Sequence, residues 1–596
     1  MRTSRWRARS SLSIECVIRG LSGMDEGKLA VNRRRFLAGL SAAGLGSTLL
    51  PGALLAVAQD ADEITVEMLD AAQRVAGLRF GRDELQRIVG RLNRPGARGP
   101  DVEVLRGAAL GNATQSALVF NPVPPGLTLP TARYPLRRAS LTVSRPTSDE
   151  ALAFLPVTHL ARLIETKQVT SAELTALYLD RLKSYDPVLH CVVSYTEELA
   201  LSQAKRADDE IAAGTYRGPL HGIPWGAKDL LSVRGTRTTW GASPYRNQSI
   251  DVDATVYSRL TAAGAVLVAK LSMGALASGD RWFGGRTRNP WNTGEGSSGS
   301  SAGPGAATAA GLVGFSVGTE TRGSIVSPSS RSGVTGLRPT FGRVSRYGAM
   351  TLAWSMDKVG PMCRAAEDCA LVLDAIQGPD GRDNTVLDVP FNWDATSDLG
   401  RLKVGYPRAA FEDEIEDNPR TPDRVARLRR IQANRREALD VLRGLGVQTV
   451  PFDLPVLPTS AIGFILDTEA AAAFDGPTLN AELDGMRDLP EQSRWPDSFL
   501  ASRFVSAVDY LQANRLRMRF IEAVHEAVGD LDLFIGSHVA LTNLTGHPEL
   551  SLPNGFHRGA PTSLRLTGKL FGEEGLLRLA HAYQAATTYH LQRPTV

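Results

Sequence analysis

Cysteine is scarce in this chain, which has four in 596 residues: Cys16, Cys191, Cys363 and Cys369. Their spacing matches no metal-binding pattern, and the chain contains neither an HExxH motif nor a paired CxxC. We therefore expect no metal ion and no other cofactor, and we interpret Cys363 and Cys369 as buried structural thiols. The chain also lacks a Lys/Arg-rich run with interleaved aromatic residues, so nothing in it supports binding to nucleic acid.

The composition is otherwise that of an ordinary soluble protein, because 43% of the residues are hydrophobic and 22% are charged. The net charge of +4 includes an Arg-rich N-terminal region and says little about binding partners. Glycine is the exception, with 57 residues, roughly a tenth of the chain where about 7% is usual. Most of this excess falls in one stretch near the middle, which indicates a specialised loop region.

An N-terminal segment has the pattern of an export signal. The run Asn32-Arg33-Arg34-Arg35-Phe36-Leu37 precedes an uncharged stretch that ends at Gln59 and closes with Ala56-Val57-Ala58. This arrangement resembles a bacterial twin-arginine signal peptide, so we expect residues 1–58 to be a leader and the protein to be periplasmic or extracellular. An uncleaved membrane anchor is the alternative, and the Pro51-Gly52 break together with the small-residue ending favours cleavage.

The rest of the chain divides into a small and a large part. Amphipathic patterns predict two short helices within 62–95, and a Pro-rich stretch at about 121–146 predicts an extended strap, so we group 59–154 as one region. This region weakly resembles the small companion subunit of tRNA-dependent amidotransferases, and a structural cap is the simpler interpretation. The large domain is predicted to span 155–596.

The large domain has the pattern of an α/β fold. Short apolar runs predict buried strands, and helical segments lie between them. The predicted strands are 265–269, 402–406, 447–452 and 533–535, and the predicted helices include 423–443 and 505–528. This alternation predicts a sheet layered between helices, an α/β/α domain.

Three segments carry the residues suited to chemistry. The first is Gly222-Ile223-Pro224 with Lys228-Asp229, the second is Gly296 to Pro304, and the third is Gly318 to Pro328. Their Gly and Ser content suggests a flexible linker at first. However, the segments run directly into apolar helix and strand patterns, which linkers do not do.

These segments resemble the amidase signature family, whose core carries GIPxxxKD, then GGSSGGS, then GTDTGGSIRxP. Further matches are residues 336–345, 357–361 and 546–553, and the resemblance spans roughly 155–590. The resemblance implies a mixed sheet flanked by helices and an amidohydrolase that cleaves a carboxamide C–N bond. It also implies a Ser-Ser-Lys triad without a cofactor.

By resemblance, Ser324 is the nucleophile, Ser300 the proton relay and Lys228 the base. Two Gly-Ser-Ser units leave Ser297 as the alternative relay, but the family's usual gap to the nucleophile selects Ser300. A serine hydroxyl needs a base within hydrogen-bond reach, and a lysine serves only when burial lowers its pKa enough to make it neutral. The resemblance also implies a cis peptide bond between Gly299 and Ser300.

Backbone N–H groups of Thr321, Arg322, Gly323 and Ser324 are expected to form the oxyanion hole. Gly299 and Ser301 are the expected supporting residues. The sequence departs from the family at three nearby positions. Glu320 replaces the usual Asp, Arg322 a usual Gly, and Val326 a common Arg. Glu320 is a conservative change, whereas Val326 removes a charged, hydrogen-bonding side chain near the site, so we expect either the substrate choice or the support of the site to differ. None of these changes alters the triad.

Other polar residues near the motifs have structural interpretations. His221 is assigned to turn packing, Asp229 to orienting the local backbone, and Asp357 and Glu549 to structural roles. The region from about 380 to 530 is expected to shape the substrate pocket. Its aromatic residues are candidates for the pocket lining or for the ordinary core, namely Phe464, Phe474, Trp495 and Phe499.

Three functions remain open from the sequence. The first is an amidase that forms an acyl-enzyme with a small-molecule amide. The sequence leaves open whether such an enzyme is a homodimer. The second is the A subunit of a glutamine-dependent aminoacyl-tRNA amidotransferase, which the export signal disfavours. The third is a catalytically inactive binding protein on the same fold, which the intact Lys228, Ser300 and Ser324 disfavour.

Overall fold

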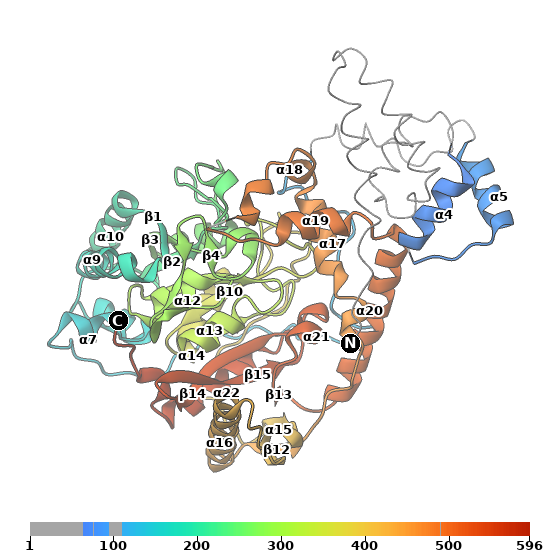
Figure 1. Cartoon of the computed structure of the whole chain (residues 1–596). Helices are drawn as coiled ribbons and strands as arrows, with labels where there is room; N and C mark the ends of the chain where they lie inside the picture. Colours follow the sequence, from blue (N-terminus) through green and yellow to red (C-terminus); the bar gives the residue numbers. More distant parts are fainter. Residues whose placement is uncertain (1–63, 76, 94–109, 489) are drawn as a thin grey trace, which may run out of the picture. The chain divides into compact units, whose positions relative to one another are not determined.

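The computed structural model describes residues 64–75, 77–93, 110–488 and 490–596, so the predicted leader lies outside the described residues. The chain forms two compact units, Met1–Ala108 and Ala109–Val596. In the first, the predicted helices are α4 (Val66–Val75) and α5 (Arg82–Leu92) (Figure 1). The Asn93 side chain joins them, accepting from Ile64 N at 2.8 Å and donating to Ile64 O at 2.9 Å.

The second unit is built on one mixed sheet of 11 strands, in the order β1-β3-β2-β8-β10-β9-β14-β15-β13-β11-β12. Its strands are β1 (Val192–Tyr195), β2 (Pro224–Lys228), β3 (Val266–Leu271), β8 (Phe315–Glu320), β9 (Thr335–Arg338), β10 (Lys358–Cys363), β11 (Lys403–Tyr406), β12 (Gln448–Pro451), β13 (Leu533–Ile535), β14 (Glu549–His557) and β15 (Ala560–Gly568). Strands β3, β2 and β8 run parallel, as do β13, β11 and β12, and the other pairs are antiparallel. The four strands predicted from apolar runs are confirmed as β3, β11, β12 and β13.

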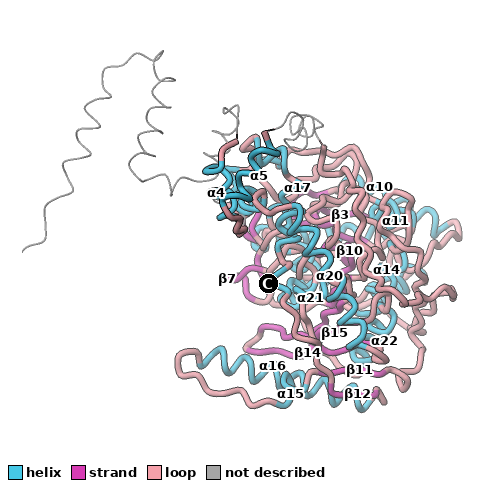
Figure 2. Tube along the Cα trace, turned by 90° about the vertical axis from the view of Figure 1, so that its right-hand side faces the viewer, coloured by secondary structure: helices cyan, strands magenta, loops and turns pink. Residues whose placement is uncertain are grey.

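Helices flank this sheet, which confirms the predicted fold class (Figure 1). They are α7 (Asp149–Ala153), α8 (Val157–Glu165), α9 (Ser171–Leu189), α10 (Glu197–Ala212), α11 (Thr255–Ala262), α12 (Ala302–Ala309), α13 (Val326–Ser332), α14 (Ala366–Ile376), α15 (Arg408–Glu412), α16 (Pro422–Gly444), α17 (Phe464–Ala473), α18 (Asp475–Leu479), α19 (Trp495–Ser502), α20 (Ala507–Val528), α21 (Val539–Leu544) and α22 (Glu573–Ala585). Two small ribbons pair β4 (Arg281–Trp282) with β5 (Gly285–Arg286) and β6 (Arg288–Asn289) with β7 (Asn292–Gly296). α15 and α16 lie with β11 and β12 at one end of the sheet, where α16 extends beyond the body (Figure 2).

The Pro-rich stretch predicted as a strap is extended and is attached to the second unit. Arg137 donates its N–H to Trp393 O at 2.9 Å, and Ala395 returns an N–H to Arg137 O at 3.0 Å. Nearer the start, the Asn112 side chain accepts from Thr351 N at 2.8 Å. The compact unit therefore begins at Ala109 and includes the strap, whereas the predicted grouping placed the strap with the two helices.

Candidate active site

Lys228 lies at the end of β2, in the interior of the sheet, and its side chain is fully buried. Its ammonium nitrogen is 2.9 Å from Ser300 Oγ and 3.0 Å from Ser301 Oγ. Thr319 on β8 supplies two more oxygens, Oγ1 at 2.9 Å and the carbonyl at 3.2 Å. Because β2 and β8 are parallel neighbours, this contact follows directly from the sheet topology.

The two serines stand just before α12. The Gly299–Ser300 peptide bond is cis, as the resemblance implied. Ser301 Oγ donates to Thr319 O at 3.0 Å and accepts from Thr319 N at 3.2 Å, so its hydroxyl proton is already engaged in a hydrogen bond. Lys228 must therefore be the donor in its hydrogen bond to Ser301, which leaves the amine free to accept a proton from Ser300 when it is neutral.

Ser297, the alternative relay, is buried in the preceding loop. Its N–H donates to Thr287 O at 3.0 Å and its hydroxyl to Ser298 O at 3.2 Å. Within the described chain it makes no hydrogen bond to Lys228. Of the two candidate serines, the structure places only Ser300 beside the amine.

Ser324 lies in the turn between β8 and α13. Its carbonyl accepts from Ser301 N at 3.1 Å, which ties the two serine segments together. Relative exposure rises along the predicted proton path, from 0% at Lys228 and 1% at Ser300 to 8% at Ser324. The predicted nucleophile is thus the member of the three that a substrate can reach most easily.

Burial lowers the pKa of Lys228 from 10.5 to about 7, against the opposing effects of Asp357 and Glu320. Desolvation disfavours the charged ammonium, and neither carboxylate forms an ion pair with it to restore that charge. A substantial fraction of the amine is consequently neutral near pH 7, which is the state that a general base requires.

The turn that carries Ser324 presents free backbone donors. In the part of the chain that the structure describes, the N–H groups from Thr321 to Ser324 make no hydrogen bond. Gly323 has φ +91°, and a Cβ on it would lie 3.1 Å from Ser327 Oγ and 3.2 Å from a Val539 methyl group. This position therefore favours glycine, and the unpaired N–H groups are available to an oxyanion.

Glu320 stabilises this turn through hydrogen bonds and an ion pair of its buried carboxylate. Its carboxylate accepts from Ile325 N at 2.8 Å and Val326 N at 3.0 Å, and it forms a buried ion pair with Arg338 at 2.7 Å. Burial alone would raise the pKa of Glu320, but Arg338 and Lys358 outweigh it and hold the pKa at about 2. Of the other departures, the Arg322 side chain is exposed, whereas Val326 is fully buried at the start of α13.

The residues given structural interpretations make structural contacts. His221 Nε2 lies 3.1 Å from Glu210, and Asp229 forms a buried ion pair with Lys270 at 3.0 Å. Asp357 accepts from Thr321 Oγ1 at 2.5 Å and from Leu352 N and Ala353 N, so it holds in place the start of the turn that carries Ser324. Glu549 is a buried partner of Arg338 at 3.3 Å.

Sequence reasoning missed Thr319, although it touches the lysine with two oxygens. It lies inside an apolar strand pattern, and only the pairing of β8 with β2 brings it to Lys228. The positioning of Thr321 by Asp357 was missed for the same reason. The one available signal was that both residues belong to, or directly neighbour, motifs shared with the family.

Two cavities approach the Ser324 turn. A smaller one of about 290 Å³ is lined by Thr319, Thr321, Asp357 and Trp240. A larger one of about 1050 Å³ is lined by Ser298, Ser327 and Val539, among others. Of the two alternatives for the four aromatic residues, pocket lining or core, the structure supports the core, because none of them lines either cavity. Phe474, Trp495 and Phe499 are buried and stack on one another in the core, while Phe464 packs against that core.

Across the described ranges, no group of His, Cys, Asp and Glu side chains is arranged to hold a metal ion. Cys191, Cys363 and Cys369 are buried and free, as expected for structural thiols. In the same part of the chain, no helix combines the length and apolar character needed to cross a membrane.

Comparison with known proteins supports one family. The family model described as Amidase matches residues 173–535. The A subunit of glutamyl-tRNA(Gln) amidotransferase from Azoarcus sp. (strain BH72) is 36% identical over 494 residues, covering 74% of this chain and 99% of the relative. The corresponding protein from Methylococcus capsulatus is 33% identical over 485 residues, covering 73% of this chain and 97% of the relative.

Solved structures give the same result. The peptide amidase from Stenotrophomonas maltophilia is 27% identical, with a TM-score of 0.64 over 74% of this chain and 98% of that one. A bacterial aryl acylamidase of the amidase signature enzymes, 21% identical with a TM-score of 0.63 over 74% of this chain and 97% of that one, shares the fold. The chain therefore belongs to the amidase family and is an amide-hydrolysing enzyme.

Proposed function

We propose that this enzyme cleaves its amide substrate through an acyl-enzyme on Ser324, with Ser300 relaying a proton to Lys228. The observation that carries this proposal is the buried Lys228 amine, 2.9 Å from Ser300 Oγ and with its pKa lowered to about 7 by burial. A lysine kept charged by a carboxylate partner could not act as a base, and Lys228 has no such partner among the described residues.

The proposed reaction has two halves. As Ser324 Oγ bonds to the carbonyl carbon, its proton passes to Ser300 Oγ and the Ser300 proton passes to Lys228. The negative charge on the carbonyl oxygen is met by the free N–H groups of the turn from Thr321 to Ser324. The C–N bond then breaks, the departing nitrogen takes the proton back through Ser300, and water releases the carboxylate by the same path.

Covalent labelling with a fluorophosphonate tests this assignment, because the probe phosphonylates an activated serine with loss of fluoride. The wild-type protein is expected to gain one label, which peptide mapping places on Ser324. Ser324→Ala is expected to gain none, whereas the matched variant Ser327→Ala, one helical turn away, is expected to label normally. An unlabelled wild type, or equal labelling of Ser324→Ala, would favour the inactive binding protein.

A second candidate function is that of one component of an amidotransferase complex, because relatives that are 36% and 33% identical are the A subunit of glutamyl-tRNA(Gln) amidotransferase. Such a component would hydrolyse glutamine as part of a protein complex. Glutamine hydrolysis by the purified chain, compared with hydrolysis of simple amides, distinguishes the two. Activity on amides in the absence of any partner supports the independent amidase, and activity that appears only with a partner supports the amidotransferase component.

We also propose that the enzyme is exported after cleavage near Ala58, on the strength of the twin-arginine pattern. In a bacterial host with that export pathway, cell fractionation is expected to find the mature protein in the periplasm. Replacing Arg34 and Arg35 together by Lys is expected to leave it in the cytoplasm. A wild-type protein that remains cytoplasmic and uncleaved would overturn this proposal and would favour the tRNA-linked function.

A further inference from the structure

The larger cavity is bordered by segments far apart in the sequence. Its walls come from α13, α16, the β14–β15 hairpin and the loop between β13 and α21. Ser327 and Val539 belong to its lining and are also the residues nearest to the Cβ position of Gly323. The cavity therefore lies beside Gly323, which belongs to the turn that carries Ser324.

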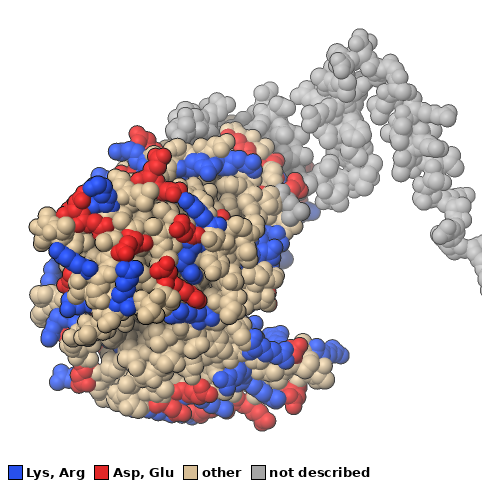
Figure 3. Space-filling view, turned by 90° about the vertical axis from the view of Figure 1, so that its left-hand side faces the viewer, with Lys and Arg blue, Asp and Glu red and all other residues tan. Residues whose placement is uncertain are grey.

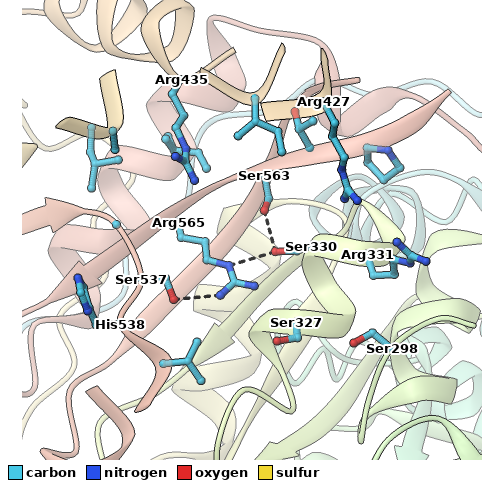
Figure 4. A pocket seen from close by; sticks show the side chains of 18 of the residues that line it. Ser298, Ser327, Ser330, Arg331, Arg427, Arg435, Ser537, His538, Ser563 and Arg565 are labelled. Carbon is cyan, nitrogen blue, oxygen red and sulfur yellow. Dashed lines mark hydrogen bonds between the residues drawn. The ribbon is translucent and has the colours of Figure 1, made fainter. Parts of the chain in front are cut away.

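Positive charge dominates the ionisable residues of this cavity, which are five arginines, one aspartate and one histidine: Arg286, Arg331, Arg427, Arg435, Arg565, Asp280 and His538. On one face of the molecule, the surface is hollowed beside a projecting part on which Lys and Arg side chains gather (Figure 3). The close-up shows Arg427 and Arg435 reaching into the cavity from one side and Arg565 facing them from the other (Figure 4).

Three of the five arginines have carboxylate partners. Arg286 pairs with Asp280 at 3.1 Å, and Arg331 pairs closely with Glu295. Arg565 lies 3.7 Å from Glu549, but this carboxylate is 3.3 Å from Arg338 and is therefore shared. The nearby carboxylates thus neutralise these three guanidinium groups, that of Arg565 only in part.

The side chains of Arg427 and Arg435 form neither an ion pair nor a hydrogen bond with any described residue. Arg435 is half-buried, and burial lowers its pKa, as does the neighbouring positive charge of Arg565. A half-buried guanidinium that faces a second one without a counter-ion costs free energy, and an anion between them would remove that cost.

Hydroxyl groups hold Arg565 in position. Its Nε donates to Ser330 Oγ at 3.2 Å and its Nη1 to Ser537 Oγ at 2.9 Å, while Ser330 is fixed in turn by Ser563 at 2.7 Å (Figure 4). These bonds restrict the guanidinium before any ligand arrives, which lowers the entropy cost of binding one. A preorganised, incompletely neutralised arginine is typical of sites for planar carboxylates.

The lining also has an apolar part, and Ile431 of this part lies on α16 between Arg427 and Arg435. The other apolar residues are Phe411, Phe452, Leu454, Phe534 and Leu564. A ligand that fits both parts has a hydrocarbon body and one anionic end. A small inorganic anion would use only the arginines and leave the apolar surface in contact with water.

We propose that this cavity binds the substrate through a carboxylate, so that the enzyme acts on amides that carry a carboxylate at the far end of a hydrocarbon chain. The carboxylate lies between Arg435 and Arg565, and the chain lies against the apolar wall. This inference rests on the proposed function, because it places the amide at Ser324.

The test compares a charged substrate with its neutral counterpart, the monoamide of adipic acid and the methyl ester of that monoamide. Arg435→Gln is expected to lower kcat/KM for the acid by about ten-fold or more, chiefly through KM, and to change the value for the ester by less than about two-fold. Arg424→Gln is the matched control, because Arg424 is on the same helix but does not line the cavity. It is expected to change neither value.

Equal losses on acid and ester, or a wild-type preference for the ester, would overturn the inference while leaving the amidase intact. If the wild type hydrolyses neither compound, calorimetry of the acid with Ser324→Ala decides the point. Binding that Arg435→Gln abolishes supports the carboxylate site, and the absence of binding overturns it. Failure of fluorophosphonate labelling, in contrast, overturns the proposed function and not the cavity's ligand.

Discussion

Lys228 is an unusual residue to find fully buried without a carboxylate partner, and its free-energy cost should be measurable. Burial lowers its pKa in the folded state to about 7, from an ordinary 10.5 that applies to the unfolded chain. Between these two values the unfolded state binds a proton that the folded state does not. The free energy of unfolding therefore rises with pH across this window.

Comparison with Lys228→Met isolates this effect. The stability of the wild type relative to the variant is expected to improve by about 3 kcal/mol between about pH 6 and about pH 9. Urea unfolding of both proteins at the two pH values provides the measurement, and other titrating groups cancel in the difference. A difference that does not change with pH would mean that Lys228 keeps its ordinary pKa.

Ser301 has a positioning role that can be separated from the role of Ser300. Its hydroxyl accepts from Lys228 at 3.0 Å while its proton is held by Thr319 O. Removing that acceptor in Ser301→Ala should lower kcat by about ten-fold and shift the pH midpoint of activity, with little change in KM. Ser297→Ala, in the same buried loop, is the control and should retain the wild-type pH profile.

The turn between β8 and α13 depends on one buried ion pair. Glu320→Gln would leave Arg338 without its closest partner in a site from which water is excluded. We expect the free energy of unfolding to fall by about 3–5 kcal/mol, measured in urea at neutral pH. Glu320→Asp keeps the charge and is expected to lose less. Equal stability of the Gln variant would show that Glu549 alone neutralises Arg338.

The stability that the Glu320 carboxylate contributes depends on pH. The pKa of Glu320 is held at about 2, below its ordinary value of 4.5. Its contribution to stability is therefore complete above about pH 4.5 and is lost as the pH falls through about 2. The Gln variant should accordingly lack this part of the acid-induced loss of stability.

Local patterns predicted several elements well, and their limits have a physical cause. Continuous apolar runs predicted β3 and β13, because a strand buried on both faces needs no polar alternation. The β14–β15 hairpin was not predicted, because polar residues such as Ser551, Ser563 and Arg565 interrupt it. Ser551 and Ser563 are hydrogen-bonded to Ser330, and Arg565 lines the larger cavity, so their burial is compatible only with the folded molecule.

At the scale of the whole molecule, the sequence motifs predicted that Lys228 and Ser300 meet but not what surrounds them. Lys228, Ser300 and Ser324 were identified from three motifs, and the structure brings Lys228 within 2.9 Å of Ser300. The larger cavity could not be predicted, because it joins residues from 280 to 565 through the strand order of the sheet. Strand order follows from long-range pairing, which short patterns do not encode.

The compact unit Ala109–Val596 contains every residue assigned to the reaction. A chain that begins at residue 109 is therefore expected to fold and to keep kcat/KM within about two-fold of the value for the longer protein. Thermal unfolding and kinetics on one amide substrate would check this. Loss of activity in a folded truncated protein would show that the unit Met1–Ala108 contributes to the site.

The rate at which fluorophosphonate inactivates the enzyme, measured as a function of pH, is the sharpest test of Lys228 as the base, because it reports the activation of Ser324 without needing the natural substrate. We expect a rate that rises with pH to a plateau, with a midpoint at about pH 7, the pKa of Lys228. We also expect Lys228→Ala to react about a thousand-fold more slowly and without this titration. A rate independent of pH, or a Lys228→Ala variant that reacts as fast as the wild type, would contradict this role of Lys228.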